Sequence, residues 1–93
     1  MASTAGVTAR LRRRIERDFA LQGNAEEVEW IVSQARDSER IQAAIVLLAA
    51  GDLERLLDAV DLALIDSRDL LVAAELAHEG WALRLDACLG PTD

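Results

Sequence analysis

The 93-residue sequence has no lysine and no tyrosine, a single cysteine (Cys88) and a single proline (Pro91). Without a second cysteine an internal disulfide is excluded, and we expect a cytoplasmic protein. Because no proline or glycine-rich hairpin interrupts the body of the chain, and β-branched residues are few, the composition predicts an all-α domain. The first residues lead into arginines and not into an apolar run, so no secretory signal is expected.

The most apolar stretch is IQAAIVLLAA at residues 41–50, which carries no charge. It is too short for a membrane span, which requires about 20 apolar residues. Four alanines favour a helix over a buried strand. Helical periodicity nearly disappears in this stretch, as is typical of a helix surrounded by its neighbours. We expect Asp37 or Ser38 to cap this helix and Gly51 to end it.

Around this centre we predict a compact all-α bundle of five or six short helices, with the buried central helix at about residues 38–50. One domain is expected over residues 7–90, between a disordered segment 1–6 and a tail 91–93. The other helices are expected to begin at Thr8, Asn24 (with Glu27 completing a capping box), Asp52, Asp66 or Ser67, and Gly80. The first of these helices is expected to end near Leu21, with Gly23 as its stop signal. The fifth helix is expected to end near His78 and the last at Gly90. A HEAT-like stack of helix pairs is a minor alternative.

Apolar side chains at helical spacing predict which face of each helix is buried. The predicted core stripes are Val7, Leu11, Ile15 and Phe19; Val28, Ile31, Val32 and Ala35; Leu53, Leu56, Leu57, Val60 and Leu64; Leu70, Leu71, Ala73, Ala74 and Ala77; and Trp81, Leu85, Cys88 and Leu89. Trp30 lies about 200° from Val28 on the helical wheel and points away from that stripe. Tryptophan is enriched at protein–protein contacts. Trp30 is therefore expected either to contact another chain or to be covered by the first helix, and Trp81 is a second interaction candidate.

The net charge of −7 is unevenly distributed along the chain. Residues 1–23 contain five arginines and two carboxylates, a net charge of +3, whereas residues 24–93 carry −10. An acidic body repels phosphate groups, so we expect neither nucleic-acid nor membrane binding. Arg10, Arg13, Arg14 and Arg17 are nevertheless interaction candidates. The favoured interpretation is that their helix is solvated or docked on the acidic body.

No arrangement of side chains predicts a catalytic site or a metal site. Glu75, His78 and Glu79 have the i, i+3, i+4 spacing of metal ligands, but with one imidazole and no nearby thiol an ordinary helix end is favoured. Cys88 lies on an apolar stripe, where a thiol is usually inert.

A polar cluster is expected where the fifth helix begins. Arg68 follows Asp66 and precedes Asp69 in the sequence. Because a guanidinium can bond a carboxylate through two parallel hydrogen bonds, these three residues are interpreted as a structural tie between helix ends.

Three segments resemble a family of small helical bacterial proteins common in actinobacteria: SERIQAA at 38–44, GDL at 51–53 and RDLLVAA at 68–74. The segment GWALRLDACLG at 80–90 resembles the family as well, so the resemblance covers about residues 38–90. Two positions differ, because Ser67 stands where the family usually has tryptophan and Gly80-Trp81-Ala82 stands for D-W-P. The family has no established activity, so the resemblance implies a helical domain and no catalytic residue.

These features favour a non-catalytic protein–protein interaction module without a cofactor. We expect its partner to be a second copy of the chain, as a homodimer, or an unidentified protein, because opposite charges on one chain permit pairing. Two alternatives stay open. One is a small-ligand or metal-binding regulatory protein with a pocket near His78. The other is nucleic-acid or membrane-surface binding through the helix that contains Arg10 and Arg17.

Overall fold

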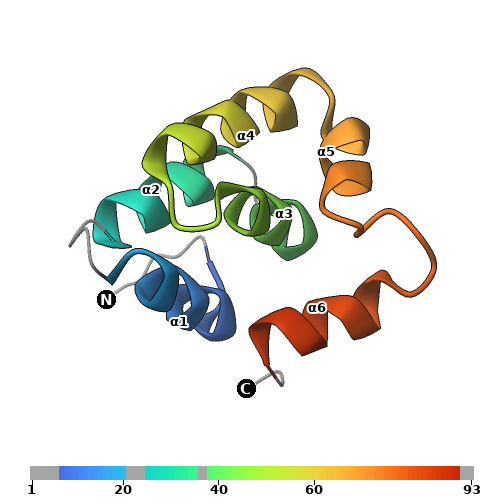
Figure 1. Ribbon diagram of the computed structural model, residues 1–93, viewed down its shortest axis with the longest axis horizontal. Helices are drawn as coiled ribbons and strands as arrows, with labels where there is room; N and C mark the ends of the chain where they lie inside the picture. The colour runs from blue at the N-terminus through green and yellow to red at the C-terminus, as the bar shows by residue number, and fades with distance from the viewer. Residues whose placement is uncertain (1–6, 21–24, 36–37, 91–93) are drawn as a thin grey trace.

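Six α-helices follow one another in the computed structural model, which describes residues 7–20, 25–35 and 38–90. They are α1 (Ala9–Asp18), α2 (Ala25–Ala35), α3 (Glu39–Ala49), α4 (Leu53–Ile65), α5 (Ser67–Ala73) and α6 (Trp81–Leu89) (Figure 1). No strand occurs within these ranges, which confirms the predicted all-α class. The Cα radius of gyration is 12.1 Å, close to the value of about 12 Å for one domain of this length. The predicted terminal segments, 1–6 and 91–93, lie outside the described residues.

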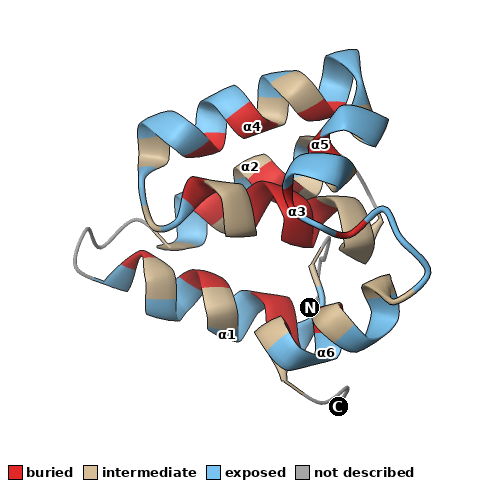
Figure 2. Cartoon of the chain, turned by 45° about the vertical axis from the view of Figure 1, so that its right-hand side comes forward, coloured by how far each residue is buried: buried red, intermediate tan, exposed pale blue. Residues whose placement is uncertain are grey.

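Helix α3 occupies the centre of the bundle and contacts α1, α2, α4 and α5 (Figure 1). Five consecutive residues of α3, 42–46, are buried together with Ala49 (Figure 2). Consecutive residues point to all sides of a helix, so neighbours surround α3 almost completely, as its missing periodicity predicted. The cover is thinner over Ile41, Leu47 and Leu48, which are half-buried. None of the described helices is both long and apolar enough to cross a membrane.

Side-chain caps begin four of the helices. The capping oxygens belong to Thr8, Ser38, Asp52 and Asp66, and each accepts a hydrogen bond from an N–H group of the first turn. These N–H groups have no acceptor within the helix, so the caps stabilise the helix starts. The sequence left Asp37 or Ser38, and Asp66 or Ser67, as alternative caps. In the structure Ser38 caps α3 and Asp66 caps α5. The predicted roles of Gly23, Asn24 and Asp37 fall outside the described residues.

The predicted ends of two helices are wrong. Helix α1 ends at Asp18 instead of near Leu21, and helix α5 ends at Ala73 instead of near His78. In both helices the apolar periodicity continues past the last helical residue, because the chain turns and still directs the next apolar residue inward. Phe19 after α1 and Leu76 after α5 are both completely buried.

A Schellman turn ends α5. The N–H of Leu76 donates to the carbonyl of Leu71 at 2.8 Å, and the N–H of Glu75 donates to the carbonyl of Val72 at 3.1 Å. Glu75 has a left-handed backbone with φ of 61°, at the position where this turn usually contains glycine. Burial of Leu76 accompanies the turn and stabilises it.

The turn between α3 and α4 contains two left-handed residues, Ala50 with φ of 50° and Gly51 with φ of 82°. The left-handed conformation that ends α3 thus begins at its C-cap residue, Ala50, one position before the predicted Gly51, which shares it. A Cβ atom on Gly51 would lie 2.7 Å from the carbonyl oxygen of Asp18. Glycine is thus required at position 51 because the turn approaches the backbone at the end of α1.

The predicted core stripes of α1 and α2 are confirmed, since Leu11, Ile15, Val28 and Val32 are completely buried. On α6, Leu85 and Leu89 are buried while Trp81 and Cys88 are half-buried. Thus three of the five predicted stripes lie on the inner face of their helices.

The predicted stripe of α4 is wrong in part. Its buried residues are Leu56, Ala59 and Ala63, whereas Leu57 and Leu64 are exposed. Small side chains allow helices to pack closely, so α4 turns Ala59 and Ala63 toward the bundle beside Leu56, and Leu57 and Leu64 outward. The stripe of α5 is corrected similarly, because Leu70 and Ala74 are buried while Ala73 and Ala77 are exposed.

Candidate functional site: an arginine network and an exposed apolar surface

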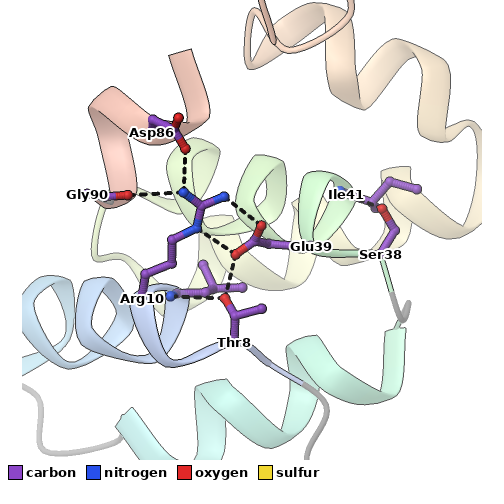
Figure 3. Close-up of polar contacts among 8 residues, drawn as sticks. Thr8, Arg10, Ser38, Glu39, Ile41, Asp86 and Gly90 are labelled. Carbon is purple, nitrogen blue, oxygen red and sulfur yellow. Dashed lines mark hydrogen bonds and ion pairs between the residues drawn. The ribbon is translucent and has the colours of Figure 1, made fainter. Parts of the chain in front are cut away.

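Helix α1 directs Arg10 into the bundle, where only 7% of the residue is exposed. Its Nε and Nη2 donate to the carboxylate of Glu39 at 2.9 and 2.8 Å. Its Nη1 donates to Asp86 Oδ1 at 2.5 Å and to the carbonyl of Gly90 at 3.0 Å. The hydroxyl of Thr8 also donates to Glu39, which completes what we call the Arg10 network (Figure 3). One guanidinium therefore joins the starts of α1 and α3 to the end of α6.

The Arg10 network stabilises the charged forms of its members. Hydrogen bonds from Arg10 lower the pKa of Glu39 below its usual value, against the opposing effect of burial, and the Thr8 hydroxyl acts in the same direction. Hydrogen bonds to Glu39, and then to Asp86, raise the pKa of Arg10. Four of the five N–H groups of this guanidinium are already used. Arg10 therefore has little capacity left for a ligand, and the network is structural.

Two further arginines of α1 bind groups of their own chain. Arg14 Nε donates to Asp18 Oδ2 at 2.9 Å and its Nη1 donates to the carbonyl of Cys88 at 2.9 Å. Arg12 Nε donates to Glu29 Oε1 at 3.1 Å. Carbonyl groups at a helix C-terminus lack helical partners and carry partial negative charge, so Arg14 stabilises the end of α6. The arginine-rich helix is thus docked on the acidic body, as the favoured interpretation held.

This docking corrects part of the list of interaction candidates. Arg10 is buried and Arg14 is half-buried, and both are bonded within the chain, so neither presents its charge to a partner. Arg13 and Arg17 are exposed. Because carboxylates of the same chain neutralise much of the basic charge of α1, the electrostatic reason for head-to-tail pairing of two copies is weaker than the sequence suggested.

Two arginines hold the connection between α5 and α6. Arg40 Nε donates to the carbonyl of Leu76 at 2.8 Å, and its guanidinium carbon lies 4.4 Å from the centroid of the Trp81 ring. Arg84 Nε donates to the carbonyl of Ala74 at 3.0 Å. A guanidinium over an indole face is attracted by the ring quadrupole. Trp81 therefore has a packing role in its own chain, which accounts for it without a partner.

The cluster at the start of α5 forms a helix cap. The N–H groups of Arg68 and Asp69 donate to Asp66 Oδ1 at 3.1 and 3.2 Å. Both side chains are exposed, and neither forms an ion pair with any described residue. The predicted bidentate tie from Arg68 is therefore absent from this part of the chain, and Asp66 alone supplies the structural role.

The residues with metal-ligand spacing do not share a helix. Glu75, His78 and Glu79 follow the end of α5, and His78 Nδ1 accepts a hydrogen bond from the N–H of Gly80 at 3.0 Å. No group of three His, Cys, Asp or Glu side chains placed to hold a metal occurs within residues 7–20, 25–35 and 38–90. The i, i+3, i+4 argument required a helix from Glu75 to Glu79, and the Schellman turn ends α5 before this stretch.

A shallow, open groove lies between α3 and α4 and not beside His78. Its volume is about 230 Å³, and it is lined by Leu48, Arg55, Asp58, Ala59 and Leu62. The sequence predicted a pocket near His78, whereas this groove lies beside α3 and α4. A cleft so open to solvent surrounds a small molecule poorly, since ligand sites usually bury most of the ligand surface.

Six large apolar side chains are exposed on the described surface: Trp30, Leu57, Leu64, Ile65, Val72 and Leu83. Trp30 is 64% exposed, so the alternative in which α1 covers it is wrong. Sequence reasoning identified Trp30 but assigned Leu57 and Leu64 to the core and did not consider Ile65. The available signal was the pair Ala59 and Ala63, which together with Leu56 forms a second stripe at helical spacing.

The resemblance to small helical bacterial proteins stays a prediction that the geometry does not test. Comparisons with protein-family models, with curated proteins and with solved structures found no match to this chain.

Proposed function

We propose that this protein is a non-catalytic protein–protein interaction module. The observation that carries the proposal is the set of six exposed apolar side chains, with Trp30 at 64% and Ile65 at 83% exposure. Single apolar residues on a surface need no explanation. Here, however, three of the six lie on one helix, α4, and another is a tryptophan, the residue type most enriched at binding hot spots.

A different protein is favoured over a second copy as the partner. The homodimer proposal drew on attraction between a basic first helix and an acidic remainder. In the folded chain Arg10, Arg12 and Arg14 bind carboxylates of the same chain. Their positive charges are therefore neutralised within one chain and attract a second copy less strongly. Sedimentation equilibrium tests this preference, because a homodimer would give a concentration-dependent mass.

Site-specific photocross-linking in the cells of origin tests the interaction function. We would place p-benzoylphenylalanine at position 30, 64 or 83, and at the exposed Glu16 on α1 as the control. A discrete adduct from an apolar position, with none from position 16, is expected. If all three apolar positions gave no adduct while circular dichroism showed a folded helical protein, the proposed function would be wrong.

A further inference from the structure

We propose that the outward side of α4 is a docking surface for a basic amphipathic helix of a partner protein; this inference rests on the proposed interaction function. The α4 face consists of Glu54, Leu57, Asp61, Leu64 and Ile65. It combines exposed apolar side chains with carboxylates that the fold leaves uncompensated. Each of these two properties restricts the chemistry of the partner.

The residues of the α4 face form one continuous stripe. At about 100° per residue they fall within a sector of about 100°, on the side opposite Leu56 and Ala63. Leu57, Leu64 and Ile65 are 47%, 58% and 83% exposed. The stripe is about 17 Å long, at about 1.5 Å per residue, which matches three turns of a docked helix. In Figure 2 the outer side of α4 is open along its length.

The carboxylates of α4 differ from those that pair with the arginines of α1. Glu39, Asp18 and Glu29 each bind an arginine. Glu54, Asp58 and Asp61 on α4 form no ion pair with any described residue, and Arg55 is the single cation of that helix. Arg55 lines the groove toward α3 and not the outward stripe. The charge of the α4 face is therefore available to a partner.

A basic amphipathic helix satisfies both requirements. Its apolar residues at i, i+3, i+4 and i+7 would cover Leu57, Leu64 and Ile65. Its lysines or arginines would lie beside Glu54 and Asp61, which speeds association and selects against acidic partners. The contact area of one helix face is small, so binding is expected to be transient, with a Kd on the order of 10 μM at low salt.

Other occupants fit less well. A second copy docked through its own α4 would place Glu54 and Asp61 against like charges. A second copy docked through α1 would bring arginines but no apolar cover, because no large apolar side chain is exposed on that helix. An anionic membrane would repel the carboxylates.

The test uses a synthetic peptide of leucine and lysine, about 14 residues long, with leucines at helical spacing. A peptide of the same composition, scrambled so that no apolar face forms, is the control. Titration into the ¹⁵N-labelled protein is followed by NMR amide shifts. We expect shifts concentrated on α4, at least about tenfold weaker binding of the scrambled peptide, and weaker binding as salt is raised.

Matched variants separate the α4 face from general acidity. The double variant Glu54→Lys, Asp61→Lys and the apolar variant Leu57→Ser, Leu64→Ser are each expected to weaken binding about tenfold. Glu26→Lys, Glu27→Lys changes the net charge equally at exposed positions of α2. This control should weaken binding less than about threefold.

Four results would overturn the inference. Equal weakening by the α2 and α4 charge variants would mean non-specific attraction. Concentration-dependent shifts on α4 without peptide would indicate a second copy, and binding to anionic phosphatidylglycerol vesicles that requires Leu57 and Leu64 would indicate a membrane. Cross-links from Trp30 but none from Leu64, with no α4 shifts, would refute the α4 docking while the interaction function stands.

Discussion

The guanidinium of Arg10 on α1 forms two parallel hydrogen bonds with the carboxylate of Glu39 on α3, at 2.9 and 2.8 Å. Arg10 is almost completely buried at this point. A buried charge is tolerated only when it is paired and hydrogen-bonded, and removal of one partner leaves the other uncompensated. The pair therefore fixes where α1 lies against α3, and its loss should weaken the whole fold.

We predict that Arg10→Ala lowers the free energy of unfolding by about 3 kcal/mol, because Glu39 is left without its partner. Arg10→Lys should recover only part of this loss, since one ammonium cannot replace the planar fork. Arg17→Ala is the control. Arg17 is exposed, and its Nε lies 3.7 Å from Asp18 Oδ1. Removal of its side chain should therefore lower the free energy of unfolding by less than about 0.5 kcal/mol. Urea denaturation followed by circular dichroism measures all three, and equal losses for Arg10 and Arg17 would contradict the structural role.

The same pair predicts a pH dependence. The pKa of Glu39 is lowered in the folded state, so the unfolded chain binds more protons. The stabilisation from Glu39 is thus complete above the ordinary glutamate pKa of about 4.3, and it is lost as the pH falls through the folded-state value. The pKa of Arg10 is raised, which changes stability only in strong alkali.

Comparison with Glu39→Gln isolates this effect from the other carboxylates. The variant should be less stable than the natural sequence by about 2 kcal/mol at pH 7. Urea midpoints at pH 7, 5, 4 and 3 should show the difference narrowing below about pH 4.3. A difference that stayed constant across this range would show that Glu39 does not titrate with a lowered pKa.

Gly51→Ala should destabilise the protein by about 2 kcal/mol, because it combines a left-handed backbone with a close contact. The added Cβ would lie 2.7 Å from the carbonyl oxygen of Asp18. Gly80→Ala is the control, since its φ of −82° suits alanine and its new Cβ would meet only the exposed His78 ring, at 3.2 Å, which a small shift of the ring relieves. Thermal unfolding should show a change of less than about 1 kcal/mol for the control. Similar melting temperatures for both variants would argue against a tight α3–α4 turn.

Glu75→Gly should stabilise the protein. Glu75 holds a φ of 61° at the turn that ends α5, and glycine adopts this conformation without a Cβ penalty. The side chain is exposed, so little packing is lost. We expect a gain of about 0.5–1 kcal/mol in the free energy of unfolding. Glu79→Gly, at a nearby exposed position that is not left-handed, should give no gain.

Arg40 and Trp81 should be energetically coupled, because the guanidinium lies 4.4 Å from the ring centroid. A double-mutant cycle with Arg40→Met and Trp81→Leu should give a coupling of about 0.5–1 kcal/mol in the free energy of unfolding. Methionine keeps much of the apolar stem while removing the charge. Additive losses would mean that the two residues contribute independently.

Local features of this fold could be predicted from the sequence, because neighbouring residues determine them. Thr8, Asp52 and Asp66 have side chains that reach the first-turn N–H groups of the helix they precede, whatever the rest of the chain does. The unbroken apolar character of residues 41–50 similarly required cover on nearly all sides. The exposure of Trp30 was one of two outcomes that its position on the helical wheel allowed.

The tertiary structure alone decided which surfaces face solvent. On α4 the stripe of Leu57 and Leu64 and the stripe of Leu56 and Ala63 have the same helical period, so sequence spacing cannot choose between them. The shape and distance of the neighbouring helices decide that the stripe with the alanines is the buried one. For Arg10 of α1, the deciding contacts are with Glu39 and Asp86, which lie 29 and 76 positions further along the chain. Electrostatic pairing depends on distance in space, and the fold sets that distance.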